Sequence, residues 1–172
     1  MRLHIGCADK RLPSPWVNAD AQSGGGADRV LNLADLWPLD AASCSWVYTS
    51  HTLEHIEFDS IPKTLAGLHR VLRPGGKLTI ATIDIVGIYE NRYKKMWAPS
   101  WNAAIYGDTW GLDRPFASHK SIFDEKVLTD LLLAAGFHDV HPWMLAEYPE
   151  IAGLIDCASR DRDVSLLLEA LA

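Results

Sequence analysis

Short apolar segments recur along the first part of the chain, separated by polar and turn-forming residues. Leu3 and Ile5 share one side of an extended segment, and a glycine follows them directly. Pro13 and Pro15 then argue against a long helix before the next apolar segment. Short segments with such boundaries are typical of β-strands. We predict strands over residues 2–5, 16–20, 29–33 and 45–49.

Two later segments have the period of an amphipathic helix. Apolar residues recur every three or four positions over residues 61–72 and again within residues 123–135, so each segment has one apolar face. The Pro74-Gly75-Gly76 turn ends the first helix, and Gly136 ends the second. Further strands are predicted over residues 77–83, 140–145 and 164–170. The composition of the last segment suits a helix equally well.

Strands that alternate with helices in this order predict an α/β fold, in which an open and mostly parallel sheet carries helices on its faces. The 172 residues, of which 48% are hydrophobic, fit a single domain that spans residues 1–172. Residues 84–120 have no clean period and are rich in aromatic side chains. We interpret them as a lid-like insertion over the carboxyl ends of the strands, where such sheets bind ligands.

Composition and charge argue against several classes of protein. The net charge is −6 without any long basic run, so nucleic acid is not an expected partner. The three cysteines lack the spacing of a metal site and indicate reduced thiols in a cytoplasmic protein. No apolar run reaches the ~20 residues of a membrane helix, and no signal peptide precedes the first strand. The oligomeric state, monomer or homodimer, stays open.

Residues at the predicted strand ends suit a cofactor that contains a ribose. Gly6 allows the backbone to approach a ligand closely, and Asp20 can accept hydrogen bonds from ribose hydroxyl groups. Asp35 and Leu36 follow the third strand and could hold an adenine, the aspartate through its polar groups and the leucine against the ring face. The later glycines of G-x-G-x-x-G are missing, which favours a cofactor without a phosphate group.

The order of the segments resembles a known enzyme family. The segments LHIGCADKRLPSPWVNAD, VLNLADL, WVYTSHTLEHI, HRVLRPGGKLTIATID and SHKSIFDEKVLTDLLLAAGFHDV follow one another as in the class I S-adenosylmethionine-dependent methyltransferases, most closely the small type 11-like members. The resemblance covers nearly the whole chain and is weakest over residues 84–116. It implies a Rossmann-like sheet of seven strands, mostly parallel with the last strand antiparallel, and S-adenosyl-L-methionine as cofactor.

The resemblance also implies roles for individual residues. Gly6, Cys7 and Ala8 would border the methionine part of the cofactor, Asp20 would bind the ribose, Asp35 and Leu36 would hold the adenine, and Thr49, Ser50 and His51 would face the sulfonium and the acceptor. Two positions depart from the family, because Ala8 and Lys10 stand where glycines are usual. The first helix is missing or reduced, so we expect a more open cofactor site.

The predicted reaction is methyl transfer to a small-molecule or glycan-like acceptor, on oxygen rather than on nitrogen. Such an acceptor loses a proton, and a neutral imidazole suits its removal, which makes His51 and His119 the candidate catalytic residues. The aromatic residues of the insertion form either a pocket for the acceptor or plain local core. The predicted acceptor-binding residues are Asp84, Tyr89, Tyr106, Trp110 and His119.

Two other functions remain open. His51-Thr52-Leu53-Glu54-His55 matches the H-x-x-E-H motif of zinc hydrolases, but that motif needs a long helix and here it follows a strand. Glu54 and His55 could equally tether the turn after the strand, and we predict no metal. With Ala8 and Lys10 in place of glycines, the chain could also be a methyltransferase-like protein that binds a partner and has lost its activity.

Overall fold

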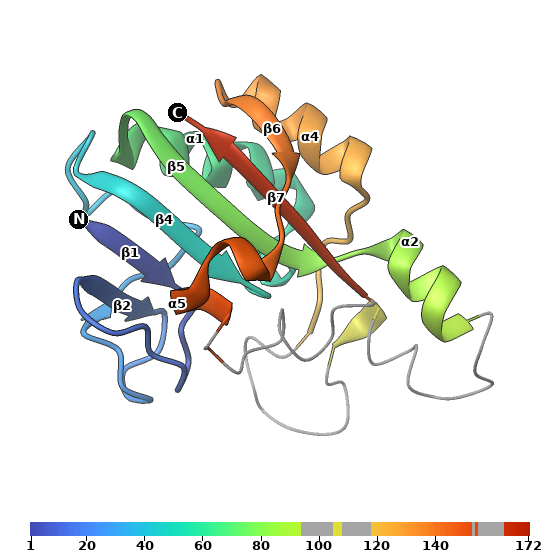
Figure 1. The fold of residues 1–172 in the computed structure, drawn as a ribbon, viewed down its shortest axis with the longest axis horizontal. Coiled ribbons are helices and arrows are strands. Elements are labelled where there is room, and N and C mark those ends of the chain that lie inside the picture. The colour runs from blue at the N-terminus through green and yellow to red at the C-terminus, as the bar shows by residue number, and fades with distance from the viewer. Residues whose placement is uncertain (94–104, 108–117, 153, 155–163) are drawn as a thin grey trace.

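A seven-stranded sheet with the strand order β3-β2-β1-β4-β5-β7-β6 organises the protein (Figure 1). The computed structural model describes residues 1–93, 105–107, 118–152, 154 and 164–172. Strand β7 runs antiparallel to β5 and β6, and the pairs among β1 to β5 are parallel. The predicted α/β class, the mostly parallel sheet and the antiparallel last strand are therefore confirmed.

The strands lie close to the predicted segments. Their bounds are β1 Arg2–Ile5, β2 Trp16–Asp20, β3 Arg29–Val30, β4 Cys44–Ser50, β5 Leu72–Ile83, β6 His138–Pro142 and β7 Ser165–Leu171. The segment predicted as a helix or a strand at the C-terminus is a strand, because its backbone pairs with β5 and β6 on both sides. Tertiary pairing thus overrides the helix propensity of its leucines and Glu169.

The bounds of three strands, β3, β5 and β6, differ from the prediction by more than one residue, and β6 lies at His138–Pro142 where residues 140–145 were predicted. Strand β3 ends at Val30, since only Arg29 and Val30 pair with β2 and the chain then turns away. Strand β5 already begins at Leu72, so the predicted Pro74–Gly76 turn lies inside it. There the N–H of Gly75 donates to the carbonyl of Ala172, at 2.6 Å, which ties this irregular stretch to the C-terminus.

One face of the sheet is covered by helices α1 (Ile61–Val71) and α4 (Glu125–Ala134), as Figure 1 shows. Their apolar faces are largely buried, with Leu65 and Leu128 in the same core cluster as Val47 of the sheet, whereas Val127 at the margin of α4 is exposed. The side chain of Asp124 caps α4 by accepting a hydrogen bond from the N–H of Val127. Burial of each such leucine contributes roughly 1.5–3 kcal/mol.

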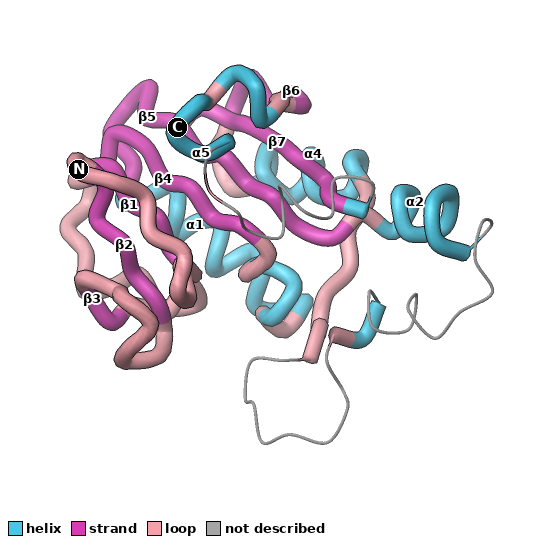
Figure 2. Tube along the Cα trace, turned by 60° about the horizontal axis from the view of Figure 1, so that its bottom comes forward, coloured by secondary structure: helices cyan, strands magenta, loops and turns pink. Residues whose placement is uncertain are grey.

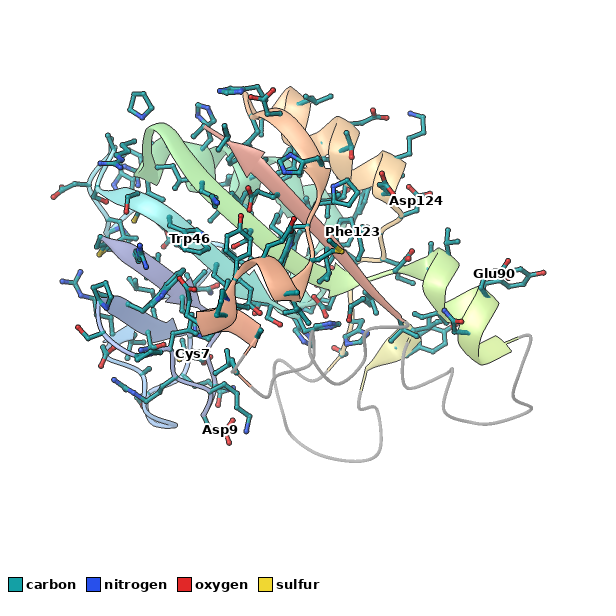
Figure 3. All side chains as sticks on the ribbon, viewed as in Figure 1. Cys7, Asp9, Trp46, Glu90, Phe123 and Asp124 are labelled. Atoms are coloured by element: carbon teal, nitrogen blue, oxygen red, sulfur yellow. The ribbon has the colours of Figure 1, made fainter. Side chains whose placement is uncertain are left out.

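The other face carries an aromatic cluster. Trp46 and Tyr48 alternate with Val47 along β4 and therefore point to the opposite side of the sheet. The rings of Trp16 and Trp46 lie 4.8 Å apart, and the edge of Trp143 meets Tyr48. Figure 3 shows Trp46 on β4. Close to this cluster lies the short helix α5 (Pro149–Ala152), which contributes a buried isoleucine.

The connection between β1 and β2 contains no helix (Figure 2), which confirms the reduced first helix. The buried amide of Asn18 holds it, because Oδ1 accepts from the N–H of Leu12 at 2.8 Å and Nδ2 donates to the carbonyl of Leu12 at 3.0 Å. Asp28 supports the same strand. It accepts the backbone N–H of Asn18 and pairs with Arg11, and these contacts lower the pKa of its carboxyl to about 2.

Short helical turns complete the described part of the chain. They are η1 Leu53–His55, η2 Phe58–Ser60, α2 Ile85–Gly87, the π-helical η3 Ile88–Tyr93 and η4 Leu145–Glu147. Of the predicted insertion, residues 94–104 and 108–117 lie outside the described residues, so the lid stays a prediction. Among the helices that the structure describes, none has the length and apolar character required to cross a membrane.

Candidate functional site

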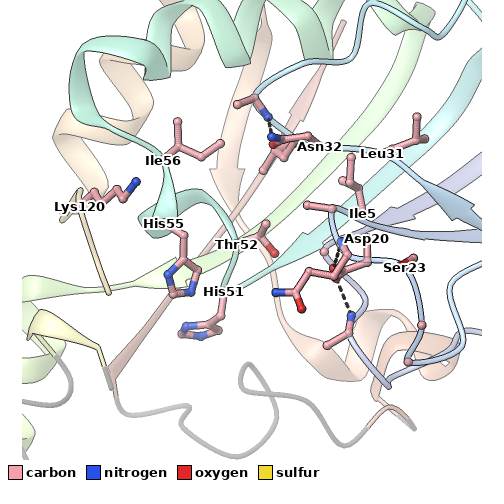
Figure 4. A pocket seen from close by; sticks show the side chains of 18 of the residues that line it. Ile5, Asp20, Ser23, Leu31, Asn32, His51, Thr52, His55, Ile56 and Lys120 are labelled. Atoms are coloured by element: carbon pink, nitrogen blue, oxygen red, sulfur yellow. Dashed lines mark hydrogen bonds between the residues drawn. The ribbon is translucent and has the colours of Figure 1, made fainter. Parts of the chain in front are cut away.

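A cavity of ≈ 580 Å³ opens at the carboxyl ends of strands β1 to β4. Each of these strands is followed by a segment that forms part of its wall, so the parallel sheet itself brings the walls together. Its volume lies within the range of about 300–1,000 Å³ that is common for small-molecule sites. Figure 4 shows Asp20 and Ser23 on one side of the cavity and His51 and His55 on the other.

Gly6 forms the turn at the end of β1, where no larger residue fits. Its φ is +80°, and a Cβ placed there would lie 1.9 Å from Oγ1 of Thr52. Its N–H and that of Cys7 both donate to the carbonyl of Ala19, at 2.8 and 3.1 Å, so the turn is fastened to β2. The backbone of Gly6 therefore lies directly on the cavity wall.

Asp20 ends β2 on the same wall and has a structural role as well. One carboxylate oxygen accepts from the N–H of Ala8 and the other from the N–H of Gln22, both at 2.9 Å. A carboxylate oxygen has two lone pairs, so each one keeps capacity for a ligand hydroxyl group. The side chain thus shapes the turn after β1 and faces the cavity.

Ala8 adopts a conformation that suits glycine. Its φ is +46°, in the left-handed region. The loop after β2 packs against it, because a Cβ on Gly25 would lie 2.7 Å from the carbonyl oxygen of Ala8. The position where the sequence departs from the methyltransferase pattern is therefore one where the backbone still has the glycine-type geometry.

Replacing Ala8 by glycine should raise the free energy of unfolding by about 0.5–1 kcal/mol. The left-handed conformation costs an L-residue about 1–2 kcal/mol, and the greater freedom of glycine in the unfolded chain offsets part of that gain. Urea denaturation measures the change. Ala66→Gly, on the exposed side of α1, is the control and should lose about 1 kcal/mol. If Ala8→Gly also lowers the free energy of unfolding, the backbone at Ala8 is not strained.

Three of the predicted cofactor residues lie beneath the cavity wall rather than on it. Cys7 is buried, and this burial raises the pKa of its thiol to about 11. Thr49 and Ser50 end β4 and are buried as well. Their hydroxyl oxygens have no hydrogen-bond partner within the described part of the chain. The structure therefore places these residues next to the site but gives them no direct access to the cavity.

The structure does not bring Asp35 and Leu36 to the cavity. The chain turns at Asn32, whose side chain accepts from the N–H of Ala34 at 2.9 Å. This turn directs Leu36 into the hydrophobic core and leaves Asp35 outside the cavity. The segment before them, residues 31–34, forms the wall instead. The cavity wall at this strand end is therefore formed by residues that precede the predicted pair.

His51 lies on the cavity wall and is held from both ring nitrogens. Its Nδ1 lies 2.8 Å from Oε1 of Glu54, and its Nε2 lies 2.9 Å from Oγ of Ser165. Glu54 is fully buried, and its second oxygen accepts from Oγ1 of Thr82 at 2.9 Å. Burial by itself would raise the pKa of the Glu54 carboxyl, but the hydrogen bond and charge of His51 and the charge of His55 outweigh it and lower that pKa.

The H-x-x-E-H motif does not have the geometry of a zinc hydrolase, so this hypothesis is wrong in its structural premise. His51 has a φ of +47° and precedes η1, which is a single turn of three residues. The two histidines of the motif therefore do not follow one another on a helix face, as the zinc motif requires. A different group comes together here, because ligand atoms of Glu54, His55 and His119 all lie within 4.8 Å of one another.

The predicted acceptor-binding residues are only partly assembled. His119 lies beside His55, with ring centroids 5.0 Å apart. The backbone N–H of His119 donates to the carbonyl of Tyr106. The Tyr106 side chain is exposed, and Asp84 caps α2 through the N–H of Val86. The remaining two predicted residues are Tyr89, which is exposed on η3, and Trp110, which lies outside the described residues.

Sequence reasoning missed several residues of the wall. The loop that follows Asp20 contains three consecutive glycines, and Gly25 packs against the turn after β1. That run of glycines was a signal for close backbone packing at this strand end. Lys120 joins the cavity from the far end of the predicted insertion. No local pattern marks it, because only the fold brings it beside the segment after β4.

Comparison with known proteins assigns the fold. A family model described as a methyltransferase domain matches residues 11–142, which is more than half of the chain. An S-adenosylmethionine-dependent methyltransferase from Mesorhizobium loti has a TM-score of 0.59 at 17% identity, covering 99% of this chain and 90% of that one. One from Archaeoglobus fulgidus has a TM-score of 0.61 at 14% identity, with 99% and 85% covered.

A structure that contains the cofactor is also similar. Phosphoethanolamine N-methyltransferase 2 from Haemonchus contortus, in complex with S-adenosyl-L-methionine, has a TM-score of 0.57 at 11% identity. The match covers 99% of this chain and 48% of that one. No curated protein sequence matches the chain significantly. The predicted Rossmann-like methyltransferase fold is thus confirmed.

Proposed function

Because the chain belongs to the family of methyltransferase domains, whose cofactor is S-adenosyl-L-methionine, we propose that it methylates a hydroxyl oxygen of a small-molecule or glycan-like acceptor. The observation that carries this proposal is the cavity at the carboxyl ends of β1 to β4, with Gly6 and Asp20 at adjacent strand ends. The cofactor supplies a methyl group that its sulfonium already activates. The residues around it therefore need to bind, orient and exclude water.

The residues present fit the cofactor. Gly6 leaves the backbone open where the methionine part would lie, and Asp20 offers carboxylate lone pairs to ribose hydroxyl groups. Ile5, Leu31 and Leu33 give the same cavity an apolar lining. The adenine ring of the cofactor would pack against these three side chains, which would take the role first expected for Leu36. We propose that Asn32 supplies the polar contact to the base that was expected from Asp35.

The end of the cavity at which we place the acceptor carries an ion pair. Lys120 and Glu57 both line it, and their side chains form an ion pair with an N···O distance of 3.1 Å. An amine acceptor is a cation at neutral pH and gains little from this ion pair, whose two charges cancel. A neutral hydroxyl group needs no negative charge on the wall in order to bind there. This balance supports oxygen over nitrogen as the methylated atom, with His51 and His119 close to this end.

Calorimetry with S-adenosyl-L-methionine and with S-adenosylhomocysteine tests the proposal. Wild-type protein should bind both, and hydroxylated acceptors should then release S-adenosylhomocysteine. Absence of binding at high micromolar cofactor would refute the methyltransferase assignment of this cavity. Binding without release across a broad acceptor panel would favour the inactive, partner-binding alternative.

Asp20→Asn should weaken cofactor binding by roughly 1–3 kcal/mol, because an amide replaces one of the two acceptor oxygens that ribose hydroxyl groups would use. Calorimetry measures the dissociation constant, and thermal melting shows whether the turn around Ala8 and Gln22 survives. Asp40→Asn, in an exposed turn before β4, is the matched control and should bind as wild type. Unchanged affinity in a folded Asp20→Asn variant would remove Asp20 from the binding site.

A further inference from the structure

Three side chains that could bind a metal ion meet beside the proposed acceptor end of the cavity. They are Glu54 and His55 on η1 and His119 on a segment distant in sequence, and their ligand atoms lie within 4.8 Å of one another. Typical zinc–ligand distances are about 2.0–2.2 Å, so a small inward rotation of these side chains would complete a site. We propose that Glu54, His55 and His119 bind one divalent transition-metal ion.

The backbone fastens the two segments that carry these residues. The carbonyl oxygen of Glu54 accepts from the N–H of Lys120 at 2.7 Å and from the N–H of Ser121 at 3.1 Å. The hydroxyl group of Ser121 also donates to the carbonyl of Ile56 at 2.6 Å. All three bonds join residues that are ligands or lie within two positions of one. The fold therefore brings His119 to η1 by fixed main-chain contacts, and the site does not depend on a chance meeting of surface side chains.

Outer partners orient two of the three ligands. Nδ1 of His55 lies 3.0 Å from the carbonyl oxygen of Ser118, which only accepts hydrogen bonds, so Nδ1 carries the proton and Nε2 keeps its lone pair. The carboxylate of Glu54 is held by His51 and by Thr82. Residues that bind metals usually have such partners, which fix the tautomer and the direction of the ligand atom. In this arrangement His51 is a positioning residue for Glu54.

The ligand set favours a particular class of ion. Two imidazoles and one carboxylate suit zinc and its neighbours in the first transition series, whereas magnesium and calcium prefer oxygen ligands. Three protein ligands leave further coordination positions open, as in catalytic sites. His55 lines the cavity, so an open position on that side can take an oxygen atom from a bound molecule (Figure 4). This differs from the H-x-x-E-H hypothesis, which used His51 as a ligand and omitted His119.

The site deepens the proposed function, on which this last step rests. An ion beside the acceptor end would hold an acceptor oxygen and polarise its O–H bond, as Lewis acids do in metal-dependent catalysis. Acceptors with two adjacent oxygen atoms, such as vicinal diols, would bind through both of them. The metal site thus names a class of acceptor, while binding of the ion itself is independent of whether methyl transfer occurs.

Titration of the metal-free full-length protein with Co²⁺ tests the proposal. We expect visible ligand-field bands that saturate at one ion per chain, and addition of acetohydroxamate, a chelator with two oxygen donors, should shift them. His55→Ala and His119→Ala should each weaken Co²⁺ binding by at least about 10- to 100-fold. The double variant His138→Ala/His141→Ala removes two exposed histidines on β6 and should bind as wild type.

Absence of the bands, or equal Co²⁺ affinity in wild type and in both ligand variants, would overturn the metal site. If acetohydroxamate leaves the bands unchanged, the bound ion has no open coordination position and that part of the proposal is wrong. Should a variant fail to fold, which circular dichroism of the metal-free protein shows, His119→Gln keeps the polar volume and is titrated in its place. Calorimetry of the same metal-free protein with S-adenosyl-L-methionine separates the proposals, because cofactor binding without Co²⁺ binding overturns the metal site alone.

Discussion

Gly6→Ala is expected to lower the free energy of unfolding by about 2–5 kcal/mol and to abolish measurable cofactor binding. The new methyl group would lie 1.9 Å from Oγ1 of Thr52, and the backbone would keep a φ of +80°. The left-handed conformation costs about 1–2 kcal/mol and the overpacking a further 1–3 kcal/mol. Urea denaturation and calorimetry with S-adenosyl-L-methionine measure the two effects.

Gly75→Ala is the matched control for Gly6→Ala. Gly75 has a similar φ of +69°, but a Cβ there meets nothing within 4 Å. The free energy of unfolding of Gly75→Ala should therefore fall only by the cost of the left-handed conformation, about 1–2 kcal/mol, and this variant should bind the cofactor as wild type does. Thr52→Ala in the Gly6→Ala background should restore only part of the stability, because Cβ of Thr52 is itself 2.8 Å from the built Cβ. Equal losses in the two glycine variants would show that the cavity turn has room to relax.

The sequence predicted the fold well where apolar period and turn residues agree. The strand at residues 2–5 and the one at 16–20 have the predicted bounds, and the helix at 61–72 is one residue shorter. Gly6 and Asp20 were predicted to lie at one edge because the carboxyl ends of parallel strands meet there, and both line the cavity. Local pattern was sufficient for these features, since each lies on or directly after a strand with a clear apolar side.

The rest depended on contacts that no local pattern records. Leu36 was expected at an adenine, but the turn at Asn32 sends it into the core. Glu54 was expected to tether the turn after β4, but its partner Thr82 on β5 and its meeting with His119, at the end of the predicted insertion, lay outside local reasoning. A single sequence shows the residue types of such a group but not their meeting, which is set by the pairing of β4 with β5 and by the return of the chain at residues 118–121.

Asn18→Ala is expected to lower the free energy of unfolding by about 3–4 kcal/mol, a large effect for one amide. Where the resemblance to the methyltransferases implies a helix after the first strand, this chain has an irregular connection, and Asn18 satisfies both the N–H and the carbonyl of Leu12. Leu12 is only 2% exposed, so water cannot replace these partners. Each buried backbone group left without a partner costs about 1–3 kcal/mol.

Asn32→Ala provides the comparison for Asn18→Ala, because the Asn32 side chain makes one exposed hydrogen bond to the N–H of Ala34. It should cost no more than about 1 kcal/mol in urea denaturation. Leu12 and Trp16 belong to the same aromatic cluster, so loosening of the connection should also change the tryptophan fluorescence of folded Asn18→Ala. Equal costs in the two variants would mean that aromatic packing alone holds the connection. If Asn18→Ala loses several times more free energy of unfolding than Asn32→Ala, the buried amide of Asn18 stabilises the connection in the absence of a helix and holds the turn at Gly6 in place.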